Sequence, residues 1–349
     1  MSEAVIERLD GRVTYRLPLR ALSVLALLLL ASLAVLVGAL MSGSFPLSAW
    51  QSVATVLGAA PSDTATTVVW EFRFPRALVS ALSGALLALS GAVLQTVTRN
   101  VLADPSLVGV SQGAGLAVVA AMIAFPQTPI GLRPILAFAG ALVVAALIQW
   151  IAMRRTGGAT MRFILTGIGV AAFISACTQA LLTYGDIDRA LAALGWLAGS
   201  VHAAGWGEAA YLSLGLLAMT PVLLWAARPL AALRMGPETA AGLGAAVRRD
   251  RTILITLSVA LAAFAVAAVG PLGFVGLVAP HVARRLARAG PGLHLALSAA
   301  AGALMVSAAD LLGRTAFAPV QLPAGLVTAA IGAPVFVWLI LRAQARSHL

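Results

Sequence analysis

The sequence predicts an all-α polytopic membrane protein, one domain over residues 1–349 with about ten transmembrane helices. Two compositional observations lead to this prediction: 61% of the 349 residues are hydrophobic, and only 10% are charged. Soluble domains carry about 25% charged residues, so this chain lacks the charge that a water-facing surface requires. Long apolar runs separated by short arginine-bearing segments are the third observation. Together they exclude a soluble enzyme.

Each apolar run of about 20 residues is long enough to cross the hydrocarbon core as a helix. In chain order the predicted spans are 21–41, 77–97, 106–124, 134–152, 161–184, 207–227, 252–268, 273–287, 293–313 and 322–341. The first run is too long for a signal-peptide core and lacks a clear cleavage site, so we expect it to be retained. Only Gly270, Pro271 and Gly273 separate the seventh and eighth runs, which leaves nine spans as an alternative.

The distribution of arginine favours ten spans over nine. The chain contains no lysine, and its 23 basic residues are all arginine, with a formal net charge of +11. With ten spans and both termini in the cytoplasm, 18 of the 23 arginines fall on the cytoplasmic side, as the positive-inside rule requires. Nine spans would move later arginines outside. Because the arginines are scattered and form no patch, the sequence does not indicate a nucleic-acid-binding protein.

Several kinds of chemistry are absent from the sequence. A phosphate-binding loop of the G-x-x-x-x-G-K-[ST] type requires lysine, so the chain is not expected to hydrolyse ATP by itself. The four histidines show no metal-ligand spacing, and Cys177 stands alone in an apolar run. Asp310 is the one acidic residue clearly inside a span, and Arg314, four residues later, shares its helix face. Local neutralisation of Asp310 is therefore favoured over a proton relay, and we predict no catalytic residue, metal site or bound cofactor.

The outer end of the second span carries arginines where the topology disfavours them. The segment Arg73-Phe74-Pro75-Arg76 opens this span from outside, and Arg314 also falls outside. Pro75 suits the first turn of a helix, where its missing N–H has no partner anyway. Arginines in these positions indicate an anionic partner, with anchoring to lipid headgroups as the alternative.

The longest predicted cytoplasmic loop, about 230–250, contains the signals of a short helix. Pro237 stands at its start, Glu238 in its first turn and Gly244 at its end. A capped helix at the cytoplasmic face could transmit motion to a soluble partner. An amphipathic helix lying on the headgroups is the alternative.

Four strings of residues together resemble a known family. They are R-F-P-R at 73–76, R-N-V-L-A-D-P at 99–105, G-F-V-G-L-V-A-P-H-V-A-R at 273–284 and G-A-P-V-F at 332–336. In this order and spacing they resemble the permease subunits of bacterial ABC importers for iron-siderophore, haem and vitamin B12, the FecCD/BtuC-like family. The resemblance extends from about residue 21 to 341. It implies a type II ABC importer permease architecture.

The resemblance also implies partners and roles. Family members work as homodimers in the bacterial inner membrane, with two cytoplasmic ATP-binding subunits that hold ATP and Mg, and a periplasmic substrate-binding protein. It implies that docking of the binding protein uses Arg73, Arg76 and Arg314. It assigns coupling to the ATPase to Leu233, Gly236, Glu238, Ala240, Leu243 and Gly244. It places the cytoplasmic gate near Thr160 and Met161.

The function that follows is a transport subunit that moves a bulky iron chelate from periplasm to cytoplasm by alternating access at a homodimer interface. An overall likeness to haem-uptake permeases favours haem as cargo, with a siderophore or vitamin B12 as alternatives. Two other classes stay open: an ATP-independent proton- or ion-coupled secondary transporter, and a membrane enzyme that uses His281 or Asp310.

Overall fold

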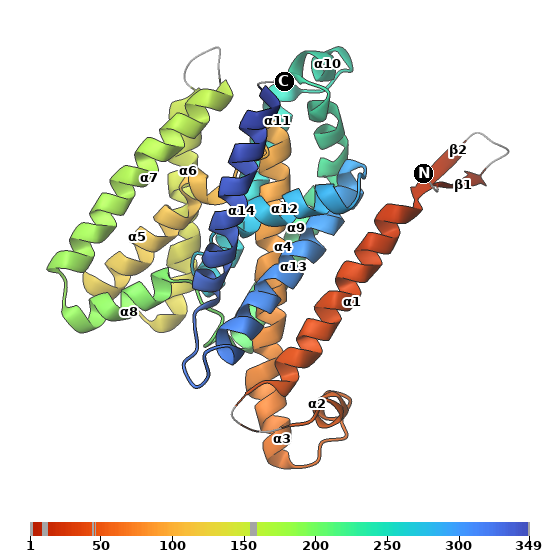
Figure 1. Cartoon of the computed structure of the whole chain (residues 1–349). Helices are drawn as coiled ribbons and strands as arrows, with labels where there is room; N and C mark the ends of the chain where they lie inside the picture. The colour runs from red at the N-terminus through yellow and green to blue at the C-terminus, as the bar shows by residue number, and fades with distance from the viewer. Residues whose placement is uncertain (1–2, 9–12, 44, 46, 154–158, 348–349) are drawn as a thin grey trace.

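The computed structural model describes residues 3–8, 13–43, 45, 47–153 and 159–347. In these ranges the chain forms a bundle of helices preceded by a small β-hairpin (Figure 1). Helix α10 marks one end of the bundle, and α2 and α3 mark the opposite end (Figure 1). Because α10 belongs to the predicted cytoplasmic loop, we call the α2–α3 end the outer end.

Helices occupy all ten predicted spans in the described part of the chain. They are α1 (Leu19–Met41), α4 (Phe74–Thr98), α5 (Val110–Ile123), α6 (Arg133–Met153), α7 (Ala159–Tyr184), α9 (Trp206–Arg234), α11 (Val247–Val269), α12 (Val275–Leu286), α13 (Pro291–Thr315) and α14 (Ala324–Ser347). By length and composition, seven described helical stretches can cross a membrane, and α5 and the apolar part of α14 are shorter. The predicted all-α membrane fold is confirmed.

Short elements connect these helices. They are α2 (Ala49–Val56), α3 (Asp63–Thr67), the π-helical η1 (Val68–Arg73), the 3₁₀ turns η2 (Pro105–Val108) and η3 (Ile130–Leu132), α8 (Ile187–Leu197) and α10 (Pro237–Gly242). Before α1, strand β1 (Glu3–Arg8) pairs antiparallel with β2 (Val13–Pro18), with Glu3 opposite Pro18. No pattern in the sequence predicted this hairpin.

The second span begins further out than predicted. Helices α3, η1 and α4 form one continuous helical stretch over Asp63–Thr98, whereas the apolar run begins at residue 77. Pro75 therefore lies inside a helix, where its ring crowds the carbonyl four residues earlier and its nitrogen donates no hydrogen bond. The wider π-helical turn immediately before it, in which the Phe74 N–H bonds to the Val69 carbonyl, accommodates this defect.

A break at residues 270–274 separates α11 from α12, which confirms that the seventh and eighth runs are distinct elements. Gly270 and Phe274 adopt positive φ angles of 74° and 66°, so the chain turns here and does not continue as one helix. Helix α12 has only 12 residues, about 18 Å of rise, so the helix itself is shorter than the about 30 Å of hydrocarbon.

Glycine pairs let the central helices approach each other closely. A Cβ at Gly84 of α4 would collide with the carbonyl oxygen of Gly302 on α13, and one at Gly91 with the carbonyl of Gly276 on α12. Helix α4 is therefore packed backbone to backbone against two neighbours, as small residues permit in membranes. Its side chains are buried along almost the whole length, from Pro75 to Thr98.

The peripheral helices present apolar side chains outward. Leu27 and Leu30 on α1 and Leu217 on α9 are each more than 60% exposed, although they belong to apolar helices. An exposed leucine surface of this extent is unfavourable in water and favourable against acyl chains. These faces are therefore the lipid-facing surface of the bundle.

We predict that Gly84→Ala destabilises the protein by about 1–3 kcal/mol, the usual result of forcing a methyl group into a filled contact. The cause is the collision with the Gly302 carbonyl. Thermal unfolding in detergent measures the effect. Gly169→Ala on α7 is the matched control, because nothing lies within 4 Å of its Cβ position. Equal stability of the two variants would contradict the close contact.

Candidate functional site

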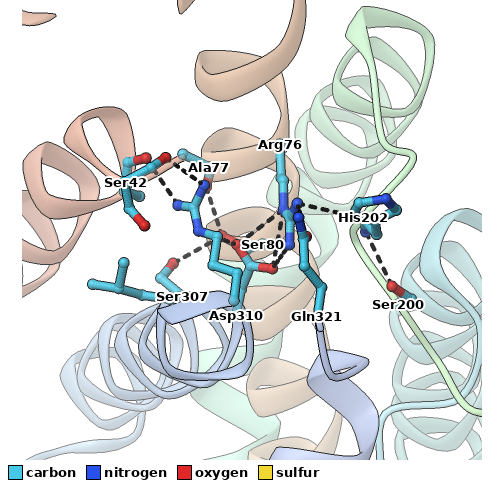
Figure 2. Close-up of polar contacts among 12 residues, drawn as sticks. Ser42, Arg76, Ala77, Ser80, Ser200, His202, Ser307, Asp310 and Gln321 are labelled. Atoms are coloured by element: carbon cyan, nitrogen blue, oxygen red, sulfur yellow. Dashed lines mark hydrogen bonds and ion pairs between the residues drawn. The ribbon is translucent and has the colours of Figure 1, made fainter. Parts of the chain in front are cut away.

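A buried ion-pair network lies at the outer end, where α4 meets α13 (Figure 2). Arg76 Nη2 lies 2.7 Å from Asp310 Oδ1, and its Nε also donates to the same carboxylate at 3.1 and 3.2 Å. The Nη1 atom of Arg76 lies 3.1 Å from His202 Nδ1 and 3.1 Å from Gln321 Oε1. The guanidinium of Arg76 therefore joins α4 and α13 to two connecting segments, the one between α8 and α9 and the one between α13 and α14.

The two other predicted docking arginines bind the C-terminal end of α1. The last carbonyls of a helix have no partner within the helix and carry partial negative charge, so cations stabilise them. Arg73 donates to the carbonyls of Leu40 at 2.6 Å, Met41 at 3.2 Å and Phe45 at 2.5 Å. Arg314 donates to the carbonyls of Ala39 at 2.9 Å and Ser42 at 3.4 Å.

Asp310 lies between two cations. Besides its contacts with Arg76, its Oδ2 is 3.8 Å from Nε of Arg314 on the same helix. Beside this group, the hydroxyls of Ser80 and Ser307 lie 3.1 Å apart and join α4 to α13 (Figure 2). The predicted neutralisation of Asp310 by Arg314 is present, but the nearer and better aligned partner is Arg76.

These contacts correct one premise of the sequence analysis. Arg73, Arg76 and Arg314 lie at the outer end, but they are only 5%, 8% and 9% exposed. A buried guanidinium without a partner has a high free-energy cost in an apolar environment. Arg76 therefore pairs with a carboxylate of its own chain. The arginines do not offer their charge at the surface in this structure, and their role in docking stays a prediction.

The coupling segment forms the predicted short helix at the other end of the bundle. Helix α10 is framed by Gly236 at φ 110° and Gly244 at φ 83°, conformations that favour glycine. One side faces the bundle, since Leu233, Gly236 and Ala240 are buried. On the other side Glu238 and Gly244 are exposed, and Leu243 is 65% exposed. Of the six predicted coupling residues, three are therefore buried against the bundle and three are exposed at the surface.

Two of the motif strings are in contact near this cytoplasmic end. A Cβ on Gly276 of α12 would lie 2.8 Å from Pro105 Cδ, so α12 packs directly on the R-N-V-L-A-D-P segment. Gln95 of α4 donates to the carbonyls of Gly276 and Leu277 at 3.3 and 3.2 Å and accepts a hydrogen bond from Arg284. No pattern in the sequence assigned a role to Gln95 or Arg284.

Asp104 fixes the start of η2 inside this contact. Its Oδ1 accepts hydrogen bonds from the backbone N–H of Ser106 at 2.8 Å and from the Ser106 hydroxyl at 2.5 Å. Burial raises the pKa of the Asp104 carboxyl above its usual value, and these hydrogen bonds oppose the shift. The residue therefore shapes the loop that follows α4.

Fewer side-chain contacts are described for the remaining predicted residues. Thr160 and Met161 fall in the first turn of α7, and their side chains lie outside the described residues. His281 is half-buried, and its Nε2 lies 3.4 Å from Arg285 Nε. Among the described residues no group of three or more His, Cys, Asp or Glu could hold a metal ion.

Comparison with known proteins decides the family. The FecCD transport family matches residues 26–342, which is most of the chain. The chain belongs to the FecCD transport family. The predicted resemblance to permeases of this type is confirmed, and the chain is a multi-pass permease subunit of the ABC importer type.

Two curated members of the FecCD family show how far the similarity extends. The achromobactin transport system permease protein of Dickeya dadantii is 37% identical over 335 residues, which cover 95% of each chain. The Fe(3+)-citrate import system permease protein of Bacillus subtilis is 40% identical, over 95% of this chain and 97% of that protein. The similarity therefore includes all ten bundle helices.

A solved structure matches the FecCD fold seen here. It is an inward-facing conformation of a metal-chelate type ABC transporter, with a TM-score of 0.81 and 27% sequence identity. The match covers 92% of this chain and 99% of that chain. This supports the permease architecture that the motif strings predicted.

We predict that Asp310→Asn and Arg76→Gln each destabilise the protein by about 3–5 kcal/mol, because each leaves a buried partner without its counter-charge. The double variant should lose less stability than the two single variants added together, because it removes both charges of the pair. Thermal unfolding of the four proteins in detergent gives the coupling free energy. Glu71→Gln, which changes an exposed acid near the same end, is expected to stay within about 0.5 kcal/mol of the parent. Strict additivity would contradict the pairing.

Proposed function

We propose that this chain is the transmembrane permease domain of an ATP-driven importer that carries a ferric chelate from the periplasm into the cytoplasm. Two copies would form the transporter in the bacterial inner membrane, with both termini in the cytoplasm. Two separate ATP-binding subunits would supply ATP hydrolysis with Mg, and a periplasmic binding protein would deliver the cargo. The observation that supports this most is the short helix α10, which is buried at Ala240 and exposed at Glu238.

The cargo is proposed from the relatives and not from the fold. Two relatives are named for achromobactin and Fe(3+)-citrate, and these names favour an oxygen-donor ferric chelate over haem. Haem, favoured by overall likeness of the sequence, and vitamin B12 are the competing cargoes. A proton- or ion-coupled carrier is the alternative mechanism.

At the outer end, we place docking of the binding protein on the segments that the arginines hold together. Arg76 connects His202 and Gln321 to the α4–α13 contact, and Arg73 and Arg314 fix the end of α1. Direct pairing with acidic residues of a binding protein would require Arg76 to exchange Asp310 for a new carboxylate. Complementary charge would then set docking orientation and association rate.

At the cytoplasmic end, motion of the ATP-binding subunits would reach the bundle through α10. Helix α10 packs against α9 and α11 through the buried Ala240, beside the buried Leu233 of α9, while Glu238 and Leu243 would face the partner. Alternating access would follow if this motion reopened the pathway, with the gate near Thr160 and Met161. A C2 dimer would repeat the lining on both sides.

Transport by the reconstituted complex tests the proposed function. The permease, its ATP-binding subunits and its binding protein are placed in proteoliposomes, and uptake of ferric citrate, other ferric siderophores, haem and cobalamin is measured. Uptake of a ferric chelate that requires both ATP and the binding protein is expected. Uptake without the ATP-binding subunits would instead establish a secondary transporter.

We predict that Glu238→Lys abolishes coupling, because it reverses the exposed charge on α10 without touching the anchored side. Uptake should fall by about tenfold or more, the effect of losing about 1.4 kcal/mol of interaction with the ATP-binding subunit. ATP hydrolysis should no longer respond to loaded binding protein. Asp188→Lys, an equal charge change on an exposed position of α8, is the matched control. Normal stimulated hydrolysis and uptake in Glu238→Lys would remove Glu238 from the coupling contact.

A further inference from the structure

A cavity of about 320 Å³ opens between α5, α7 and α8, at the turn between α11 and α12. Ser111 and Gln112 of α5 form one wall, and Ser175, Thr178 and Gln179 of α7 form another. Leu194 and Leu197 of α8 and Pro271 of the turn supply apolar surface. The cavity is therefore lined by uncharged hydrogen-bonding groups and by apolar groups, without a charged side chain.

One of these polar groups has no protein partner among the described residues. Gln112 Oε1 is buried without a hydrogen-bond partner among the described residues. The Thr178 hydroxyl is used locally, at 3.0 Å from the Ile174 carbonyl. A buried amide oxygen without a partner costs about 1–3 kcal/mol, so its retention in an apolar helix indicates a ligand or water.

The polar face of α7 is not suited to lipid. Ser175, Thr178, Gln179 and Leu182 are spaced to share one face of the helix, and all four line the cavity. Phe173, which is 71% exposed, lies on the opposite face. Acyl chains offer no hydrogen-bond partners to hydroxyl and amide groups, whereas they solvate a phenylalanine side chain favourably. The helix thus separates an exposed apolar side from a side lined by polar groups.

The cavity also lies directly beneath the outer segments. Pro271, in its wall, packs on Gly199, and the Ser200 N–H bonds to the Val269 carbonyl at 2.8 Å. His202, two residues further on, is the contact of Arg76 in the outer network. The wall of the cavity is therefore joined to the outer network through residues 199–202.

We propose that this cavity binds the outer polar groups of a ferric chelate during transport, with Gln112 Oε1 accepting a hydrogen bond from a hydroxyl group and Ser175 donating one to a carboxylate oxygen. The inference rests on the proposed function and adds a contact site for the cargo inside the membrane. A serine hydroxyl can donate to a carboxylate oxygen, and a glutamine amide oxygen can accept from a hydroxyl group. A neutral lining holds an anionic chelate without the strong pairing that an arginine would make, so the chelate can leave again.

Protection of an introduced thiol tests this site in the assembled transporter. Ser175→Cys is made in a Cys177→Ala background, since Cys177 is the single cysteine of the chain. In proteoliposomes with the ATP-binding subunits and the binding protein, ferric citrate should slow labelling by a water-soluble maleimide about threefold at twice its Kd, by mass action. Thr64→Cys in the same background, on an exposed position of the short polar helix α3 at the outer end, is the control and should be labelled equally fast with and without ferric citrate.

Substitution of Gln112 separates a binding role from a structural one. Gln112→Leu should raise the apparent Kd for protection about three- to tenfold, the effect of one lost hydrogen bond, and Gln112→Glu should raise it further because it adds like charge. Gln112→Asn should restore part of the affinity. Gln149→Leu on α6, outside the cavity lining, should leave the Kd unchanged.

The outcomes distinguish the two proposals. If the parent complex imports a ferric chelate but the thiol is unprotected, or is inaccessible without cargo, the cavity is not a binding site and the proposed function stands. If ATP and unloaded binding protein protect the thiol as well as ferric citrate does, the protection reflects a conformational change alone. That result would also contradict the proposed binding site. If the parent complex imports no ferric chelate, the proposed function fails and the inference fails with it.

Discussion

Backbone contact at small residues is the interaction on which this bundle depends. Acyl chains solvate leucine as well as a neighbouring helix does, so apolar side chains provide little net attraction between helices in a bilayer. At Gly84 and Gly91 of α4 the backbone instead touches the backbones of α13 and α12. This proximity allows the motif strings to meet, since R-F-P-R and R-N-V-L-A-D-P stand at the two ends of α4.

The polar groups follow from the same constraint. In an apolar environment each charge or free carbonyl needs a partner within the protein. Arg76 therefore pairs with Asp310, and Arg73 and Arg314 bind the last carbonyls of α1. At the opposite end, Arg284 and Gln95 make a similar connection between α12 and α4. The outer end and the cytoplasmic end of α4 are thus each fixed by a guanidinium, with close packing between them.

Much of the fold could be predicted from local signals. The length of apolar runs gave the ten helices, and Pro237, Glu238 and Gly244 gave the short cytoplasmic helix, because span length and helix caps depend on neighbouring residues. The outward extension of the second span was missed, since Asp63–Thr67 is polar and carries no hydropathy signal. The short length of α5 was also missed, because the apolar run continues through η2.

The site was less predictable, because its contacts join distant parts of the chain. Arg76 and Asp310 are 234 positions apart, and no pattern in a single sequence pairs them. The topology rule correctly selected Arg73 and Arg76 as unusual, but it did not show whether their partner was internal or external. His202, Gln321 and Gln112 stand in no recognisable spacing, and only the folded chain brings them to the network and the cavity.

The limited length of α12 has a consequence for assembly of the protein in the membrane. A helix of 12 residues is too short to be inserted as an independent span. Its preceding turn has polar backbone groups that need partners, and Ser200 supplies one of them from the α8–α9 segment. Helices α11 and α13 are each long enough to span the bilayer, so α12 alone depends on these neighbours and on the α8–α9 segment for its place in the membrane.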